Sequence, residues 1–261
     1  MRGIGSCVHS RRFQLDQQIS VALSVAEKIR SRMFPSANSF LLAGSVVRGE
    51  ATVTSDLDLI VVFNRVEHAT RQSFLFADWP VEAFIHDPHT LMYFFDEVDR
   101  PTGVPSLANM VSEGIEVPGK TELGMLIKDL ADQNIEAGPV PWGQQERDNS
   151  RYFISEMIED IRAPRTPDEL YPVVADLYTA VADHFCRSKN QWSAKGKSIP
   201  RRLKSLDPVF CRRFTDVFAA AFAKDDTAGV IQLCEDVLQP DGGLFFDGYN
   251  RDAPSNWRTT E

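Results

Sequence analysis

The stretch that decides the fold reads GSVVRGEATVTSDLDLIVVF and runs from Gly44 to Phe63. Asp56 and Asp58 stand one residue apart at the start of its apolar run. Alternate residues of a strand point to the same face, so we expect the two carboxylates to project together. Two ionised carboxylates at short range repel each other, which predicts a cation between them. Mg²⁺ meets that need because it prefers oxygen ligands.

The residues just upstream supply groups that suit a phosphate. Gly44 and Ser45 follow a short apolar segment, and a glycine there lets the backbone approach a ligand closely. Backbone N–H groups and the Ser45 hydroxyl can bind phosphate oxygens, and Arg48 can add a charge-assisted contact. A phosphate cradle beside a metal pair predicts phosphoryl or nucleotidyl transfer. The competing interpretation is a hairpin in which Ser55 and Asp56 make turn contacts and Asp58 is a solvated charge.

The flanking sequence predicts an α+β fold, in which a small unit of helices and strands (with residues 64–80 as a connecting segment) is followed by an all-α helical bundle. We expect a nucleotide-binding domain over residues 1–140 and a helical domain over residues 141–261, with a connector at 140–150. Glycine and proline end the last helix before that connector. The tail from Gly242 is rich in Gly, Asp and Asn and is expected to be irregular. The predicted strands are 39–44, 57–63 and 81–86, and the predicted helices include 15–33, 121–137, 151–162, 168–188, 207–224 and 225–238.

Composition narrows the classes of partner. The net charge of −9 argues against a nucleic-acid partner held by a broad basic face. No apolar run reaches the length of a membrane span, and the N-terminus lacks the apolar core of a secretory signal. The cysteines show no CxxC or metal-like spacing and are predicted to be reduced thiols, so a cytoplasmic location is expected. They are Cys7, Cys186, Cys211 and Cys234.

Taken together, Gly44-Ser45, Arg48-Gly49 and Ser55-Asp56-Leu57-Asp58-Leu59 resemble the signature of the polymerase-beta-like nucleotidyltransferase superfamily. The resemblance implies that Asp56 and Asp58 hold two catalytic Mg²⁺ ions. It also implies that the turn at Gly44 and Ser45, with Arg48 and Ser55, binds ATP or another nucleoside triphosphate.

The family places a third acidic residue on a neighbouring strand. Glu82, inside the short apolar run VEAFIH, is the first candidate, since a lone carboxylate is costly to bury without a partner. Asp87 is the second candidate, with a turn role before Pro88 as its alternative. Glu82 is expected to complete the metal site, to act as the general base for the attacking hydroxyl, or to do both.

The helical half resembles the aminoglycoside-type adenylyltransferases in layout. Lys195 and Lys197 flank Gly196 in a loop before a helix and are expected to contact the triphosphate, with a solvated basic loop as the alternative. Glu156 and Asp160 are four residues apart on a predicted helix and share a face. They would suit a polyamine-like acceptor or form a solvated stripe.

The sequence therefore predicts a Mg²⁺-dependent nucleotidyltransferase that moves a nucleoside monophosphate, with AMP from ATP as the first choice, to a hydroxyl of a small-molecule acceptor. The first expectation for that acceptor is an aminoglycoside- or lincosamide-like compound, by resemblance and by the acidity of the chain. The alternative is a non-catalytic nucleotide-binding, antitoxin-like or regulatory protein on the same scaffold. The oligomeric state is left open, and a homodimer is compatible with the resemblance.

Overall fold

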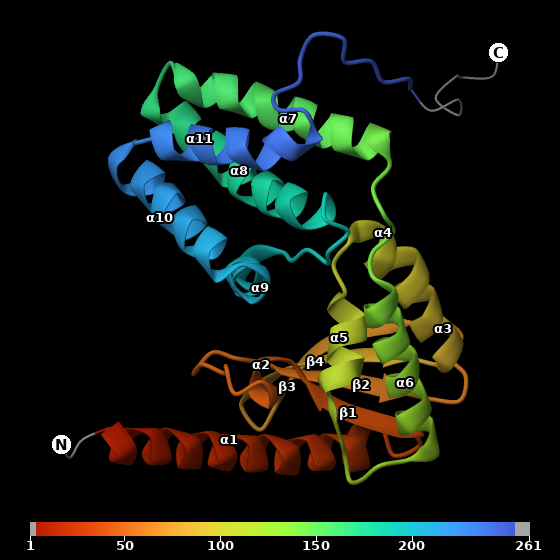
Figure 1. Ribbon diagram of the computed structural model, residues 1–261. Helices are drawn as coiled ribbons and strands as arrows, with labels where there is room; N and C mark the ends of the chain where they lie inside the picture. Colours follow the sequence, from red (N-terminus) through yellow and green to blue (C-terminus); the bar gives the residue numbers. More distant parts are fainter. Residues whose placement is uncertain (1–3, 254–261) are drawn as a thin grey trace. The chain divides into compact units, whose positions relative to one another are not determined.

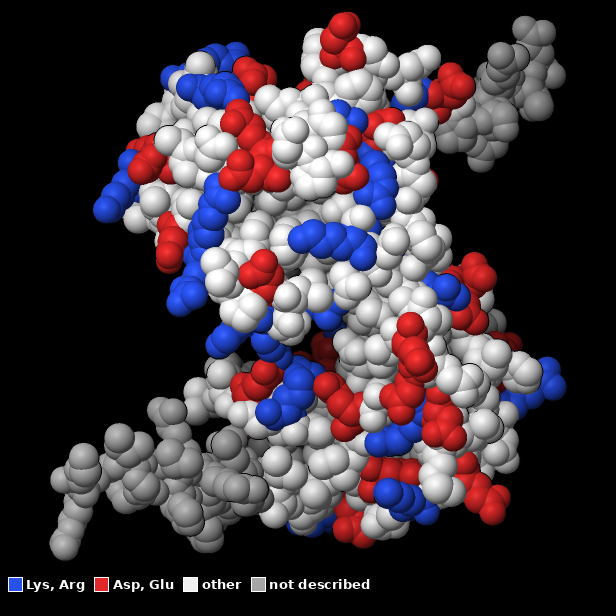
Figure 2. All heavy atoms as spheres, in the orientation of Figure 1, with Lys and Arg blue, Asp and Glu red and all other residues white. Residues whose placement is uncertain are grey.

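The computed structural model describes residues 4–253 and divides the chain into two compact units, Met1–Gly138 and Pro139–Glu261 (Figure 1). The first unit is built on a mixed sheet and the second is helical. The predicted α+β fold class is confirmed. None of the helices in residues 4–253 combines the length and apolar character that a membrane span requires. On the face shown in Figure 2, basic and acidic side chains are interspersed.

The sheet of the first unit has five strands in the order β3-β4-β2-β1-β5. β2 and β4 are parallel, whereas every other neighbouring pair is antiparallel. The strands are β1 (Ser39–Ala43), β2 (Leu57–Val62), β3 (Thr70–Phe76), β4 (Trp79–His86) and β5 (Ile115–Glu116).

Both faces of this sheet are covered by helices, which explains the continuous apolar run of β2. Leu57, Leu59 and Val61 pack with apolar residues of α1, and Ile60 and Val62 pack with residues of α5 and α6 on the opposite face (Figure 1). The period of two along β2 therefore sets which face each side chain takes. The helical segments of this unit are α1 (Ile4–Met33), α2 (Gly44–Val47), α3 (Pro88–Tyr93), η1 (Phe94–Asp99), α4 (Arg100–Thr102), α5 (Ser106–Glu113) and α6 (Glu122–Ala137).

The second unit has a separate apolar core to which its long helices contribute. Phe214 and Phe218 of α10 are fully buried there and contact Tyr178 edge-on. The segment after residue 241 is irregular up to residue 253, as predicted. The elements are α7 (Gln144–Arg162), α8 (Pro167–Arg187), η2 (Gly196–Ser198), α9 (Ile199–Leu206), α10 (Pro208–Lys224), α11 (Ala228–Leu238) and η3 (Gln239–Asp241).

Several parts of the sequence prediction are wrong. The first helix, predicted over 15–33, begins at Ile4, and the short strand β5 was not predicted. Residues 70–76 were expected to connect two strands but form β3, and the helix expected to begin at Arg151 begins at Gln144. The early start of α7 follows from one half of a capping box, in which the Glu146 carboxylate accepts the Gly143 N–H at 2.9 Å. The first two turns of α7 are polar throughout, so they carry no apolar period that would have indicated a helix.

Candidate active site

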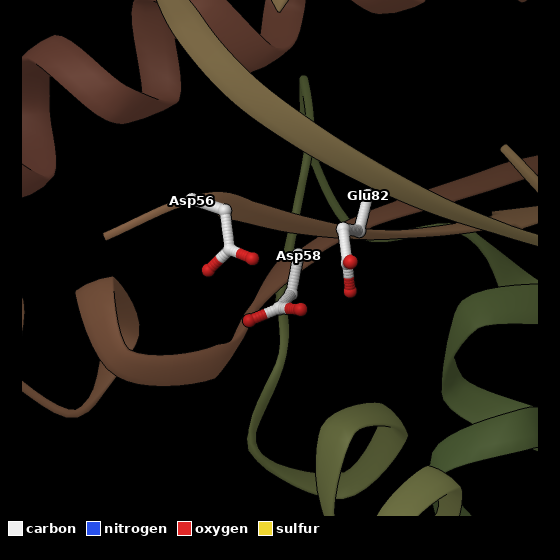
Figure 3. A group of neighbouring side chains, drawn as sticks. All are labelled: Asp56, Asp58 and Glu82. Carbon is white, nitrogen blue, oxygen red and sulfur yellow. The ribbon is translucent and has the colours of Figure 1, made fainter. Parts of the chain in front are cut away.

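The pairing of three strands brings Asp58 and Glu82 side by side. Antiparallel β1 and β2 place Ala43 opposite Asp58, and parallel β2 and β4 place Asp58 opposite Glu82. Asp56 lies two residues before Asp58, just outside β2. All three carboxylates point to the same side (Figure 3). One carboxylate oxygen from each lies within 4.8 Å of the others, and each residue is partly buried.

This carboxylate cluster (Asp56, Asp58 and Glu82) is electrostatically unfavourable by itself. At such a separation each pair of ionised carboxylates repels by roughly 3 kcal/mol for an effective dielectric constant of about 20. Oxygen-only donors from three chain positions fit a hard divalent cation such as Mg²⁺ better than a softer transition metal. The residues present therefore fit the metal that the sequence predicts.

Gly44 has a second reason to be glycine, which the sequence prediction missed. It follows β1, has φ +77° and begins α2. A Cβ atom at this position would lie 1.9 Å from Oδ2 of Asp58 and 2.8 Å from its Cγ. Glycine is required both by the left-handed backbone and by the close approach of the Asp58 carboxylate. The predicted phosphate turn and the acidic cluster are thus in contact.

Ser45 and Ser55 occupy different local settings. Ser45 lies in the first turn of α2, where backbone N–H groups lack intrahelical acceptors. The Ser55 hydroxyl accepts the Thr52 N–H at 2.8 Å, and the Ser55 N–H donates to the Thr52 carbonyl at 3.1 Å. Ser55 thus closes the turn that leads into Asp56, which is the turn contact considered as an alternative in the sequence.

Arg48 is held by carboxylates of the protein. Its guanidinium donates to Glu50 at 3.0 Å and to Glu113 at the end of α5. Burial lowers the pKa of Arg48, but the hydrogen bonds and charges of Glu50 and Glu113 outweigh it, so the pKa is raised overall. In this arrangement Arg48 joins α2 to α5.

Arg71 is a site residue that the sequence prediction did not identify. It lies on β3, and its guanidinium donates to Oε2 of Glu82 at 2.5 Å. The same guanidinium lies over the Phe84 ring, 5.1 Å from the centroid. Alternation of Phe74 and Phe76 was the available sign of this strand, since both pack on the core that contains Leu57.

The remaining predicted residues lie outside the carboxylate cluster. Asp87 caps α3 by accepting the Thr90 N–H at 2.8 Å, and it also accepts the Val66 N–H at 3.0 Å. Lys195 and Lys197 are exposed residues of the second unit, in the segment that leads into α9.

Comparison with known proteins gives one family. Residues 23–102 match the family described as a nucleotidyltransferase domain, a range that contains all of the carboxylate cluster and the Gly44 turn. None of the curated proteins matches the sequence significantly. Among solved structures, similar chains include a nucleotidyltransferase-like protein from Exiguobacterium sibiricum, which is 14% identical, with a TM-score of 0.41 over 84% of this chain and 75% of that chain. A likeness at this level carries no functional argument.

Proposed function

We propose that the chain is a Mg²⁺-dependent transferase of nucleoside monophosphate, a proposal supported by the match of residues 23–102 to the nucleotidyltransferase domain family. The donor is ATP or another nucleoside triphosphate, the acceptor is a hydroxyl of a small molecule, and pyrophosphate leaves. The observation that carries the proposal is the carboxylate cluster in contact with Gly44.

Asp56, Asp58 and Glu82 would hold the metal. Bound Mg²⁺ would offset the negative charge of the triphosphate and favour loss of the acceptor's hydroxyl proton. We assign Glu82 to the metal because it pairs in register with Asp58 on the adjacent parallel strand. Without the metal its carboxylate is paired with Arg71 of β3, and Mg²⁺ would have to displace that pairing. The chain's own contribution is then to hold three charged oxygens at one sheet edge.

The segment after β1 would bind the triphosphate. The N–H groups at the start of α2 and the Ser45 hydroxyl are donors next to the carboxylate cluster, on a backbone that Gly44 bends. We propose that Arg48 links α2 to α5 and does not bind the triphosphate, since Glu50 and Glu113 already pair with its guanidinium. For Lys195 and Lys197, which are exposed residues of the second unit, a contact with phosphate stays a proposal that rests on the resemblance alone.

An aminoglycoside- or lincosamide-like acceptor remains part of the proposal, on the resemblance and on the net charge of −9. The non-catalytic alternative would use the same carboxylate cluster to hold the Mg²⁺ complex of a nucleotide, so the transfer assay is what separates the two functions.

Incubation with α-labelled nucleoside triphosphates and a panel of antibiotics, proteins and RNAs tests the proposal. We expect a labelled small molecule that requires Mg²⁺, and a rate at least about a hundredfold lower for Asp56→Asn with Asp58→Asn. Glu67→Gln is the control, because it removes a carboxylate on an exposed residue of the same unit. A labelled product that the double variant forms at the native rate would contradict the assignment, as would failure of the native protein to label any acceptor.

A further inference from the structure

A pocket in the second unit lies between α7 and the irregular segment that follows η3. Its volume is about 920 Å³, within the range of small-molecule sites in proteins. Phe153, Glu156 and Asp160 line it from α7, and Phe245 and Phe246 line it from the irregular segment. All of these residues belong to one compact unit.

Buried polar groups of α7 hold the irregular wall of this pocket in place. The Arg151 guanidinium donates to the Gly243 carbonyl at 2.9 Å and lies over the Phe245 ring, 4.7 Å from its centroid. The Phe245 N–H donates to the Ser155 hydroxyl at 2.9 Å. Arg151 and Ser155 are only 8% and 6% exposed. A charged side chain is rarely buried without such a partner, so these contacts hold Gly243 and Phe245 of the wall against α7.

The wall that these bonds fix presents apolar side chains to solvent. Phe246 is 71% exposed, Phe153 is 48% exposed and Leu244 is 41% exposed, and all three line the pocket. Tyr152 and Tyr249 stack beside it with centroids 3.8 Å apart, and Tyr152 also stacks with Phe246. Contiguous exposed apolar side chains of this kind mark ligand-binding grooves and interaction sites in proteins.

The charged side chains that line the pocket are acidic; next to them, Arg162 pairs with Glu159 at 3.0 Å and Arg151 lies over the Phe245 ring. Glu156, Glu159 and Asp160 line it, and among the described lining residues none is basic. Glu156 accepts the Tyr152 hydroxyl at 2.8 Å, which fixes one carboxylate at the edge of the aromatic surface. Aromatic faces attract cations, and carboxylates beside them add direct charge attraction.

We propose that this pocket binds a hydrophobic organic cation, meaning an ammonium group that carries an apolar or aromatic substituent. The carboxylates of Glu156 and Asp160 would meet the ammonium, and Phe153, Phe245 and Phe246 would cover the substituent. The aromatic walls favour such a ligand over a polycationic sugar, which has little apolar surface to bury. The proposal does not depend on nucleotide transfer, because none of the lining residues belongs to the first unit.

Calorimetric titration of the full chain with 4-phenylbutylammonium and with its neutral counterpart 4-phenylbutanol tests the proposal. The titration is done in EDTA without nucleotide, so its outcome is separate from that of the transferase assay. We expect the ammonium to bind at least about tenfold more tightly than the alcohol. Glu156→Gln with Asp160→Asn should remove that difference. Phe153→Ala with Phe246→Ala should weaken both ligands.

Asp176→Asn with Asp216→Asn is the matched control, since it removes the same charge from exposed residues of the same unit outside the pocket. Equal affinity for ammonium and alcohol would overturn the proposal, as would an equal loss of ammonium affinity in the control. Failure of both probes to bind would also overturn it. If the chain binds a basic amphipathic peptide through these residues but does not bind the ammonium, the proposal is also overturned.

Discussion

Asp58 lies where three local requirements meet. The next residue before it, Leu57, is fully buried on the opposite face of β2, which fixes the direction of the Asp58 side chain. The strand pairing places Glu82 beside it, and the close approach of its carboxylate excludes any side chain at Gly44. One residue therefore connects the apolar core, the metal ligands and the phosphate turn.

Replacement of Gly44 by alanine tests that connection. The new Cβ would lie 1.9 Å from Oδ2 of Asp58, and φ +77° is unfavourable for alanine by about 1 kcal/mol. We expect Mn²⁺ affinity to fall at least about tenfold. The free energy of unfolding in urea should fall by about 1 kcal/mol, the cost of the positive φ. Gly119→Ala is the control, since a Cβ there meets nothing within 4 Å. Unchanged Mn²⁺ binding in Gly44→Ala would show that Asp58 does not need this approach.

Replacement of Arg71 should raise the Mn²⁺ affinity, whereas replacement of Gly44 should lower it. Its guanidinium competes with a metal for Glu82 and adds a positive charge next to the carboxylate cluster. Arg71→Ala should therefore bind Mn²⁺ about threefold or more tightly in the absence of nucleotide, because both effects disfavour the cation. Electron paramagnetic resonance of free Mn²⁺ measures this change. Arg65→Ala removes the same charge from an exposed residue of the same unit and should have little effect. Weaker binding in Arg71→Ala would mean that the ion pair preorganises Glu82 for the metal.

At the scale of elements, the hairpin of β3 and β4 carries Arg71 to the site. Its turn residues, Ala77 and Asp78, both have positive φ, at 49° and 66°. These angles match the two-residue turn that twists with the strands, for which Asn-Gly is preferred. Alanine and aspartate at these two positions do not indicate such a turn, because neither residue favours positive φ as glycine does. This explains why β3 could not be predicted from its turn.

Introducing the preferred residues should stabilise this hairpin. We expect Ala77→Asn with Asp78→Gly to raise the free energy of opening of β3 by about 1 kcal/mol, since both replacements relieve the cost of positive φ. Native-state hydrogen exchange of the β3 amides that pair with β4 measures it. Faster exchange in the variant would indicate that the turn has another conformation.

Asp99 anchors the start of α5 and adds a dependence on pH. Its Oδ2 accepts the N–H groups of Leu107 and Ala108, each at 3.0 Å, and burial raises its pKa to about 6. The carboxyl group in an unfolded chain has a pKa of about 3.9, so the folded state binds more protons between these values. Its contribution to stability is therefore greatest below about pH 4 and falls as the pH rises to about 6.

Asp99→Asn removes this titration and keeps an oxygen that can accept both N–H groups. Compared with the native protein, the variant should gain in melting temperature as the pH rises from 4 to 7. Differential scanning fluorimetry across this range measures the difference, and the other titrating groups cancel because they are common to both proteins. A constant difference across the range would contradict the raised pKa.

At the scale of the whole molecule, the chain has two units with separate apolar cores. Separate cores predict separate unfolding transitions. We expect Mn²⁺ to shift only the transition of the first unit and 4-phenylbutylammonium only that of the second. Each ligand at a hundred times its dissociation constant stabilises its unit by about 2.7 kcal/mol. Scanning calorimetry measures both shifts, and a single transition that responds to both ligands would contradict the separation.

In the first unit, the features that depend only on neighbouring residues in the chain could be predicted from the sequence. The buried run of β2, the paired aspartates and the end of α6 at Gly138 all follow from period or turn chemistry. Arg71 could not be found in this way, because its role depends on an exposed edge strand paired through a turn of uncommon residues. The close approach of Asp58 to Gly44 could not be predicted from the sequence either, because it arises only when β1 and β2 pair and bring Ala43 opposite Asp58.

The most direct test of the central claim is anomalous diffraction from crystals of the native protein soaked in Mn²⁺. The account predicts an anomalous peak about 2 Å from carboxylate oxygens of Asp56, Asp58 and Glu82, the usual coordination distance of a small divalent cation. Mn²⁺ bound elsewhere, with the oxygens of Asp56 and Asp58 turned away from each other, would contradict it.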